Sequence, residues 1–230
     1  MIQEIREEAI FIADSHYPHH GQEFLDILQR IERGEIQTPQ LFLMGDNFDL
    51  LCGYANNAYL EEFSKDAIII LQQLSQKLEI HYIEGNHDFL LSSIFPNINV
   101  YSRDAQPIIF KLNNQKVALS HGDKYAIDWM YNLYAKVSRD KLVIKLLKPL
   151  EKFIVDYLMK KLSKKKICHS FDGFEKRVAK IMRYYKGIDI VIEGHFHQAK
   201  TIDNYISLPS LACQKEVGVI ENSKMVFKKL

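Results

Sequence analysis

A chain of 230 residues, 47% of them hydrophobic and 26% charged, is long enough to bury a substantial core, and this composition excludes an intrinsically disordered protein. Thirty basic residues against twenty-nine acidic ones give a formal net charge of +1, which excludes a global attraction to nucleic acid or to an anionic surface. We therefore expect one domain over residues 1–230 and no nucleic-acid partner.

Short β-type runs alternate along the chain with longer segments of helical period, which is the pattern of an α/β fold. In chain order, the predicted strands are Ala9–Ala13, Leu41–Met44, Ile80–Ile83, Pro107–Leu112, Lys116–Leu119, Ile188–Ile192 and several runs near the C-terminus. The predicted helices are Gln22–Arg33, Ala58–Lys77 and three or four pieces between Ala126 and Tyr185. The residues NNQ between Leu112 and Lys116 predict a hairpin turn.

The cysteines, the first residues and the apolar runs bear on the cellular compartment of the protein. Cys52, Cys168 and Cys213 are odd in number, far apart and in no CxxC spacing, so we expect neither a disulfide framework nor a cysteine-based zinc site. The first residues, MIQEIREEAIF, carry acids where a signal peptide carries basic residues, and no apolar run approaches the ~20 residues of a membrane span. We therefore expect a cytoplasmic location.

Each of the five best strand candidates ends abruptly in charged or coordinating side chains, in the stretches FIADSH, FLMGDNFD, YIEGNHD, ALSHGD and VIEGHFH. In layered α/β folds, ligand sites collect at the carboxyl ends of strands, where loops bring distant segments together. The coordinating residues of these five stretches are Asp14, His16, Asp46, Asn86, His87, Asp88, His121, Asp123, His195 and His197.

This set combines imidazole, carboxylate and amide groups without a thiolate, which favours Mn²⁺, Fe²⁺ or Zn²⁺. Two ions are expected, because one ion cannot use so many donors, whereas a carboxylate such as Asp46 can bridge two ions about 4 Å apart. Any one of these histidines alone is more often an ordinary surface or core residue. Chance would, however, have to place polar groups that are costly to bury at every strand end. The joint pattern favours a metal centre.

The ordered blocks DSH, GDNFD, GNHD, HGD and GHFH resemble the signature of the calcineurin-like metallophosphoesterase superfamily over nearly the whole chain. The resemblance implies a four-layer αββα sandwich with a dinuclear metal centre. It implies that one ion is held by Asp14, His16, Asp46 and His197. It implies that the other ion is held by Asp46, Asn86, His121 and His195.

Two such cations would make water nucleophilic near neutral pH and stabilise the charge that develops on phosphoryl oxygens, so no serine or cysteine nucleophile is needed. His87 is the candidate to donate a hydrogen bond or a proton at the phosphoryl or leaving-group oxygen, with Asp88 orienting it. Asp49 and Asp123 are either carboxylates that support the ligands from behind or caps of their loops.

A helical insertion is expected over residues 124–186. From Lys124 to Ser170 there are twelve Lys or Arg residues against four acidic ones. Apolar residues such as Leu146 and Phe153 recur at helical spacing beside a basic stripe that includes Lys141 and Lys145, and Pro149 should kink or split the segment. This pattern is typical of a helix at a membrane surface or of a cap that takes acyl chains. The alternative is a lid that packs on the body or on a second subunit, with solvated lysines.

The insertion between HGD and GHFH, together with FLL directly after GNHD, resembles the UDP-2,3-diacylglucosamine pyrophosphatases of lipid A biosynthesis. That resemblance implies hydrolysis of UDP-2,3-diacylglucosamine to UMP and 2,3-diacylglucosamine 1-phosphate, typically with Mn²⁺. It also implies peripheral contact with the inner face of the cytoplasmic membrane. The chain departs from that subfamily at His87, where arginine is common, and at Phe196, where threonine is commoner.

Two other classes of function remain open. One is a soluble metallophosphodiesterase or phosphatase that acts on nucleotides or other small phosphate esters. The other is a non-catalytic scaffold of the same fold, which predicts that metal ligands have been lost from the blocks, and none has been.

Overall fold

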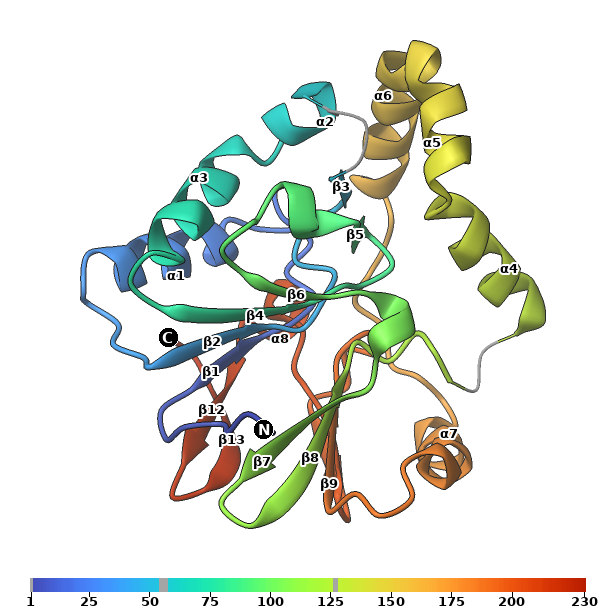
Figure 1. Cartoon of the computed structure of the whole chain (residues 1–230). Helices are drawn as coiled ribbons and strands as arrows, with labels where there is room; N and C mark the ends of the chain where they lie inside the picture. Colours follow the sequence, from blue (N-terminus) through green and yellow to red (C-terminus); the bar gives the residue numbers. More distant parts are fainter. Residues whose placement is uncertain (1, 54–57, 126–127) are drawn as a thin grey trace.

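The computed structural model describes residues 2–53, 58–125 and 128–230, which form two facing β-sheets with helices on their outer faces (Figure 1). In spatial order, the six-stranded sheet consists of β13 (Lys224–Lys228), β12 (Val217–Glu221), β1 (Ile10–Ile12), β2 (Gln40–Leu43), β4 (Glu79–Ile83) and β6 (Asn99–Tyr101). The five-stranded sheet consists of β10 (Lys200–Ile202), β11 (Tyr205–Ser207), β9 (Ile190–Glu193), β8 (Gln115–Ser120) and β7 (Ile108–Leu112).

Strand β1 shows why its short apolar sequence occupies the centre of a layered fold. Successive strand residues face opposite sides of a sheet, so Ile10 and Ile12 join the core under the helices while Phe11 joins the core between the two sheets. Phe11 stacks on Phe42 there, with ring centres 4.4 Å apart. Because both faces are covered, every residue of β1 is apolar and buried.

The outer layers are helical. Helices α1 (Glu23–Glu32) and α3 (Lys65–Leu74) bury their apolar residues against the six-stranded sheet. Helix α7 (Phe174–Ile181) packs on the outer face of the five-stranded sheet through Phe174, Val178 and Ile181. The predicted αββα sandwich is confirmed.

The parallel pairing of the strands gathers the predicted site. Strands β1, β2, β4 and β6 run parallel, with Ile12 opposite Leu43 and Leu43 opposite Tyr82. In the second sheet, β8 and β9 are parallel, with Ser120 opposite Glu193. The segments that follow these strands therefore leave the sheets at one edge, where their side chains can meet.

Most predicted elements exist, with changed boundaries. The predicted hairpin is the antiparallel pair β7–β8. The single helix expected over Ala58–Lys77 is wrong: α2 (Ala58–Glu62) is separate from α3, and Ser64, a favoured N-cap residue, leaves the helical conformation between them. The elements that sequence reasoning missed include β3 (Leu51–Cys52), β5 (Asp88–Phe89) and α8 (Leu211–Gln214).

The predicted insertion contains α4 (Trp129–Ser138), α5 (Lys141–Leu147) and α6 (Glu151–Leu162), which project together beside the sheets (Figure 1). A 3₁₀ turn over Lys148–Leu150 separates α5 from α6, as Pro149 predicted. Ala126, where the helical region was expected to begin, lies outside the described residues.

The expectation of no disulfide is wrong, because Cys168 and Cys213 form one, with Cα atoms 5.4 Å apart. The segment after α6 passes alongside α8, which carries Cys213, so two residues separated by 45 positions meet. Sequence spacing does not reveal such an encounter. The pairing removes the cysteine argument for a reducing compartment, and a cytoplasmic location stays a prediction.

We predict that Cys168→Ser lowers the free energy of unfolding by about 2–4 kcal/mol, because the disulfide closes a long loop and so restricts the unfolded chain. Urea denaturation measures this change. Wild-type protein in dithiothreitol should unfold at the same urea concentration as the variant, and the variant should not respond to the reductant. A wild-type curve that dithiothreitol does not shift would contradict the pairing.

Candidate metal centre

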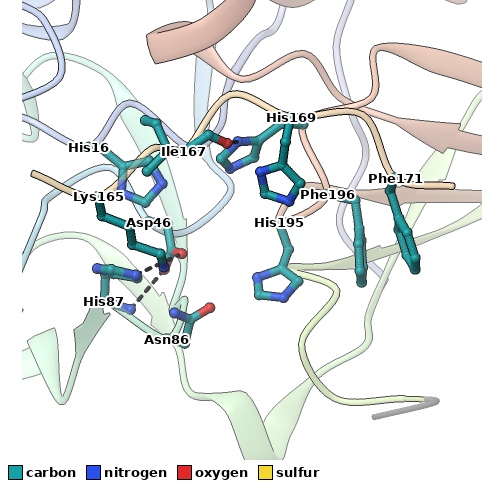
Figure 2. Close-up of a pocket in the computed structure, with 11 residues that line it drawn as sticks. His16, Asp46, Asn86, His87, Lys165, Ile167, His169, Phe171, His195 and Phe196 are labelled. Atoms are coloured by element: carbon teal, nitrogen blue, oxygen red, sulfur yellow. Dashed lines mark hydrogen bonds and ion pairs between the residues drawn. The ribbon is translucent and has the colours of Figure 1, made fainter. Parts of the chain in front are cut away.

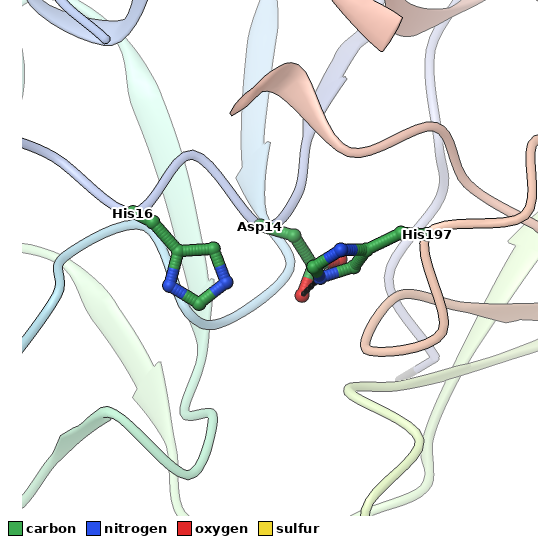
Figure 3. A group of neighbouring side chains, drawn as sticks. All are labelled: Asp14, His16 and His197. Carbon is green, nitrogen blue, oxygen red and sulfur yellow. Dashed lines mark ion pairs between the residues drawn. The ribbon is translucent and has the colours of Figure 1, made fainter. Parts of the chain in front are cut away.

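Two groups of three donor side chains lie at the strand edge, and within each group the donor atoms are all within 4.8 Å of one another. The first group contains Asp14, His16 and His197 (Figure 3). The second group contains Asp46, His121 and His195. Six of the seven predicted ligands thus lie in these two groups, with Asp46 in the second group only.

The backbone of these loops is unusual. Asp14, His16, Asp46, His195 and His197 all have positive φ, with values of 52°, 46°, 51°, 66° and 55°. This left-handed conformation costs a residue with a side chain about 1–3 kcal/mol and is concentrated at functional sites. The cost is incurred at five of the residues that carry donor groups, which indicates a functional constraint on these loops.

In the first group, the hydrogen bonds fix which atoms face the centre. The Asp14 carboxylate accepts a hydrogen bond from the backbone N–H of His195 at Oδ2 (2.8 Å), whereas its buried Oδ1 has no hydrogen-bond partner among the described residues. His197 donates through Nδ1 to the carbonyl oxygen of Ile167 (3.1 Å). In the neutral ring, Nε2 therefore presents a lone pair, 3.3 Å from Asp14 Oδ1. Two acceptors facing each other are stabilised by a cation between them.

The second group repeats this arrangement. His121 donates through Nδ1 to the carbonyl oxygen of Met44 (2.9 Å), so Nε2 of the neutral ring presents its lone pair. That Nε2 lies 3.1 Å from His195 Nδ1, 3.3 Å from Asn86 Oδ1 and 3.5 Å from Asp46 Oδ2. Imidazole nitrogens, a carboxylate and an amide oxygen around one point form a donor set suited to a borderline divalent cation.

The pKa values reflect burial and the neighbouring charges. Burial lowers the pKa of His16 well below its usual value, and burial together with His121 lowers the pKa of His195 to about 3, so both rings are neutral. Burial also acts to lower the pKa of His121, but the Asp46 carboxylate outweighs it and raises that pKa well above its usual value. The same opposition between burial and Asp14 raises the pKa of His197. Neutral imidazole is the form that binds a metal.

His87 faces both donor groups. Its ring centre is 4.9 Å from that of His16, and its Nε2 is 4.0 Å from Asp46 Oδ2 (Figure 2). The ring is held by a hydrogen bond from Nδ1 to the carbonyl oxygen of Asp49 (2.6 Å). Because Nδ1 carries a proton there, Nε2 can donate one only when the ring is an imidazolium.

The role expected for Asp88 is corrected, because its carboxylate oxygens contact backbone groups instead of the His87 ring. Oδ1 accepts from the N–H groups of Asp46 (3.0 Å) and Gly85 (2.8 Å), and Oδ2 accepts from the N–H of Asn47 (2.7 Å) and the hydroxyl of Tyr82 (2.7 Å). A buried carboxylate is stabilised best where several N–H donors converge, as they do at this turn. Asp88 thus holds the GDN loop against the GNHD loop.

These two loops approach so closely that a Cβ at Gly85 would overlap the Asp46 carboxylate. Glycine is therefore required between them.

The two other predicted carboxylates are also buried partners of cations or donors. Asp49 Oδ2 accepts from the N–H (2.9 Å) and ring Nδ1 (2.7 Å) of His19. Asp123 Oδ2 accepts from Arg103 Nε (2.7 Å). Neither carboxylate reaches a ligand ring among the described contacts, so Asp49 acts on His87 only through its backbone carbonyl.

Helix α4 is tied to this region through arginines. Arg103 Nη2 donates to the carbonyl oxygen of Asp123 (2.7 Å) and to Asn132 Oδ1 (2.6 Å) in α4. Arg139, at the end of α4, donates to the carbonyl oxygen of Gly85 (2.7 Å) in the GNHD loop. The position of the insertion is thereby linked to the loop that carries Asn86 and His87.

A cavity of about 340 Å³ opens onto the donor groups. One wall is the irregular segment 163–172 after α6, which we call the strap and whose residues at alternate positions from 165 to 171 line the cavity (Figure 2). These strap residues are Lys165, Ile167, His169 and Phe171. The sequence analysis did not predict that these residues line the site. Their spacing of two residues, directly after a basic helix, is a pattern that could have indicated it.

The four cap residues predicted to contact substrate lie elsewhere. Lys141, Lys145, Leu146 and Phe153 are exposed, and none lines the cavity at the donor groups. Leu146 and Phe153 are 69% and 75% exposed. The helical period correctly predicted an amphipathic insertion, but it could not predict which face is turned toward the site.

Comparison with known proteins places the chain in a family. The model of the calcineurin-like phosphoesterases matches residues 9–199. The chain belongs to this family. It is a metal-dependent hydrolase that acts on phosphate esters.

Two similar curated proteins carry the same name. The chain is similar to a UDP-2,3-diacylglucosamine hydrolase of Histophilus somni (strain 129Pt), with 28% identity over 86% of this chain and 87% of the relative. It is also similar to the UDP-2,3-diacylglucosamine hydrolase of Aliivibrio fischeri (strain MJ11), with 26% identity over 84% and 82%. Among solved structures, a dimetal phosphatase from Danio rerio matches with a TM-score of 0.46 and 12% identity over 96% of this chain and 95% of that one.

We predict that Asp88→Asn lowers the free energy of unfolding by about 1–3 kcal/mol and weakens metal binding, because the new amide group would face backbone N–H donors. Tyr82→Phe is the matched control. It removes one of the hydrogen bonds to Asp88 without adding a donor, so it should cost only about 0.5–1.5 kcal/mol. Thermal unfolding and Mn²⁺ titration by calorimetry test both variants. Equal effects of the two substitutions would contradict the role given to Asp88.

Proposed function

We propose that the protein hydrolyses the pyrophosphate of UDP-2,3-diacylglucosamine to UMP and 2,3-diacylglucosamine 1-phosphate with two divalent metal ions, most favourably Mn²⁺. The observation that carries the dinuclear part is the pair of donor groups, in each of which three donor atoms lie within 4.8 Å of one another. The names of the curated relatives support the substrate.

In this proposal the residues would divide between the two ions as the resemblance implied. Asp14, His16 and His197 would hold one ion, and Asn86, His121 and His195 would hold the other. Asp46 would bridge them, since its carboxylate lies beside His16, His87 and Asn86 (Figure 2). Mixed nitrogen and oxygen donors without thiolate suit Mn²⁺, and they also admit Fe²⁺ or Zn²⁺.

When bound, two such cations activate water as the nucleophile and screen the charge on the phosphoryl oxygens. The chain itself supplies the remaining parts. Imidazolium His87 would donate from Nε2 to the phosphoryl or leaving-group oxygen, because the Asp49 carbonyl fixes its Nδ1. The strap would limit access of bulk water, since it forms a wall of the cavity.

An apolar crevice supports the assignment of an acylated substrate. It has a volume of about 140 Å³ and lies between α5–α6 and the β3–β5 pair. Its lining includes Ile144, Val155 and Leu158 from the insertion and Phe89 from the body. Phe89 follows His87 by two residues, so a chain held in the crevice would lie close to the reacting centre. We assign this crevice to an acyl chain of the substrate.

The outer face of the insertion suits an anionic lipid surface. Exposed Leu146, Leu150 and Phe153 lie among the basic residues Lys145 and Lys152, a combination typical of interfacial helices. No helix among the described residues is long and apolar enough to cross a membrane. We therefore propose peripheral contact through this face, at the cytoplasmic side of the membrane.

The functional cap is smaller than the range 124–186 in this proposal. Helix α7 buries Phe174, Val178 and Ile181 against the five-stranded sheet and thus belongs to the body. The cap would comprise α4, α5 and α6, with the strap as its return.

We predict that Asp46→Ala loses both ions, whereas His87→Ala keeps both ions and lowers kcat by about 10²–10⁴-fold. The physical reason is that Asp46 would contact both ions and His87 neither. Metal content by plasma emission spectroscopy and steady-state rates with UDP-2,3-diacylglucosamine measure the two effects. Full metal content in Asp46→Ala, or an unchanged rate in His87→Ala, would contradict these roles.

If the wild type hydrolyses bis(p-nitrophenyl) phosphate or simple monoesters far better than the UDP-linked lipid, the protein is a soluble phosphodiesterase or phosphatase.

The two faces of the cap should respond separately to substitution. Ile144→Ser in the crevice should raise KM for UDP-2,3-diacylglucosamine in detergent about tenfold, while binding to anionic vesicles is retained, because about one buried apolar side chain of contact is lost. Phe153→Ser on the exposed face should weaken vesicle binding and leave that KM unchanged. Flotation with phosphatidylglycerol vesicles and detergent-based kinetics test the pair. Identical responses of the two variants would show that the faces are not distinct.

A further inference from the structure

An aromatic wall of the cavity has no part in the chemistry described above. Phe171 of the strap and Phe196, between His195 and His197 in sequence, both line the cavity. Their rings form a stacked pair, with centres 5.6 Å apart and 20° between the planes (Figure 2). The ring of Phe196 is 4.7 Å from the His195 imidazole, so the wall begins directly beside a metal donor.

The inner ring of this wall is held rigidly. The guanidinium carbon of Arg177 lies 3.6 Å from the centre of the Phe196 ring. Arg177 is itself buried, and its Nη2 donates to Glu193 Oε2 (3.0 Å) and to the carbonyl oxygen of Gly122 (2.9 Å). Phe174 packs against Phe196 from α7 at 5.8 Å. Phe196 therefore cannot turn away without disturbing a buried ion pair.

The outer ring, Phe171, belongs to the strap, which is itself fixed to the body by several contacts. The N–H of Phe171 donates to Gln198 Oε1 (3.2 Å), and the carbonyl oxygen of Ile167 accepts from His197 Nδ1 (3.1 Å). Between these two points, the disulfide joins Cys168 to α8. The Phe171 side chain nevertheless remains 38% exposed. Binding of a planar ligand over an exposed aromatic ring is favourable, because it removes apolar surface from water and allows stacking.

We propose that Phe171, backed by Phe196, is the platform on which the pyrimidine base of the substrate's nucleotide stacks while the adjoining phosphate lies at the donor groups. This assignment deepens the proposed function and rests on it, because the UDP-linked substrate supplies the base. Stacking on an aromatic ring recognises the flat face of a base without reading its hydrogen-bonding edge.

Calorimetric titration of the Mn²⁺-loaded protein with UMP tests the platform directly and does not depend on turnover. Phe171→Ala should raise the Kd for UMP by about 5- to 100-fold, the range expected for the loss of one stacked base. Phe171→Tyr should restore wild-type affinity, whereas Phe171→Leu, which is apolar but not flat, should not. Phe153→Ala is the matched control: it removes an exposed phenylalanine away from the cavity and should leave UMP binding unchanged.

The other product distinguishes the base from the other parts of the substrate. In Phe171→Ala, binding of 2,3-diacylglucosamine 1-phosphate and of inorganic phosphate should match the wild type. A loss confined to the sugar phosphate would show that the ring contacts sugar or acyl chain and would overturn the proposal. Unchanged UMP affinity in Phe171→Ala would overturn it as well.

Failure of the substrate assignment would look different. If the UDP-linked lipid is not hydrolysed but UMP binding still depends on Phe171, the platform stands and the proposed substrate falls. If that lipid is hydrolysed with unchanged KM and UMP affinity in Phe171→Ala, the platform alone falls.

Discussion

Metal-donor atoms that converge in a buried space are the constraint on which the rest of this structure depends. Carbonyl oxygens accept hydrogen bonds from Nδ1 of His121 and His197, so in the neutral rings the Nε2 lone pairs face Asp46 and Asp14. Burying such groups without compensation costs several kcal/mol each. A divalent cation bound to each group would turn this cost into binding free energy, which is why we propose a metal centre here.

The surrounding structure holds these acceptors together. Asp88 accepts from backbone N–H groups of the GDN and GNHD loops, and Gly85 lets those loops approach. Arg139 extends the link from Gly85 to the end of α4. On the other side, Ile167 of the strap accepts the proton of His197, and the Cys168–Cys213 disulfide ties the strap to α8. The insertion is therefore linked to the centre at two places, through Arg139 and through the strap.

Much of the fold and the donor set could be predicted from the sequence, because both depend on local patterns. Short apolar runs with polar tips specify strands covered on both faces, and the parallel order of those strands brings Asp14, Asp46 and His121 together. The type of side chain then limits the chemistry. Agreement at these positions reflects strong local signals rather than knowledge of the tertiary contacts.

What could not be predicted depends on tertiary contacts without a local signal. The role of Asp88 depends on backbone donors from a loop about forty residues away. The disulfide requires the strap to pass α8, and the direction of the Leu146 and Phe153 side chains depends on how α5 and α6 dock. The helical periodicity indicated that the insertion is amphipathic, but it could not predict what each face of the insertion contacts.

Anomalous scattering from crystals grown with MnCl₂ would locate any metal ions bound by the two donor groups. We expect two manganese peaks about 4 Å apart, one beside Asp14, His16 and His197 and the other beside Asn86, His121 and His195, with the Asp46 carboxylate touching both. A single peak, or a map without peaks at these positions under saturating manganese, would contradict the proposed dinuclear centre.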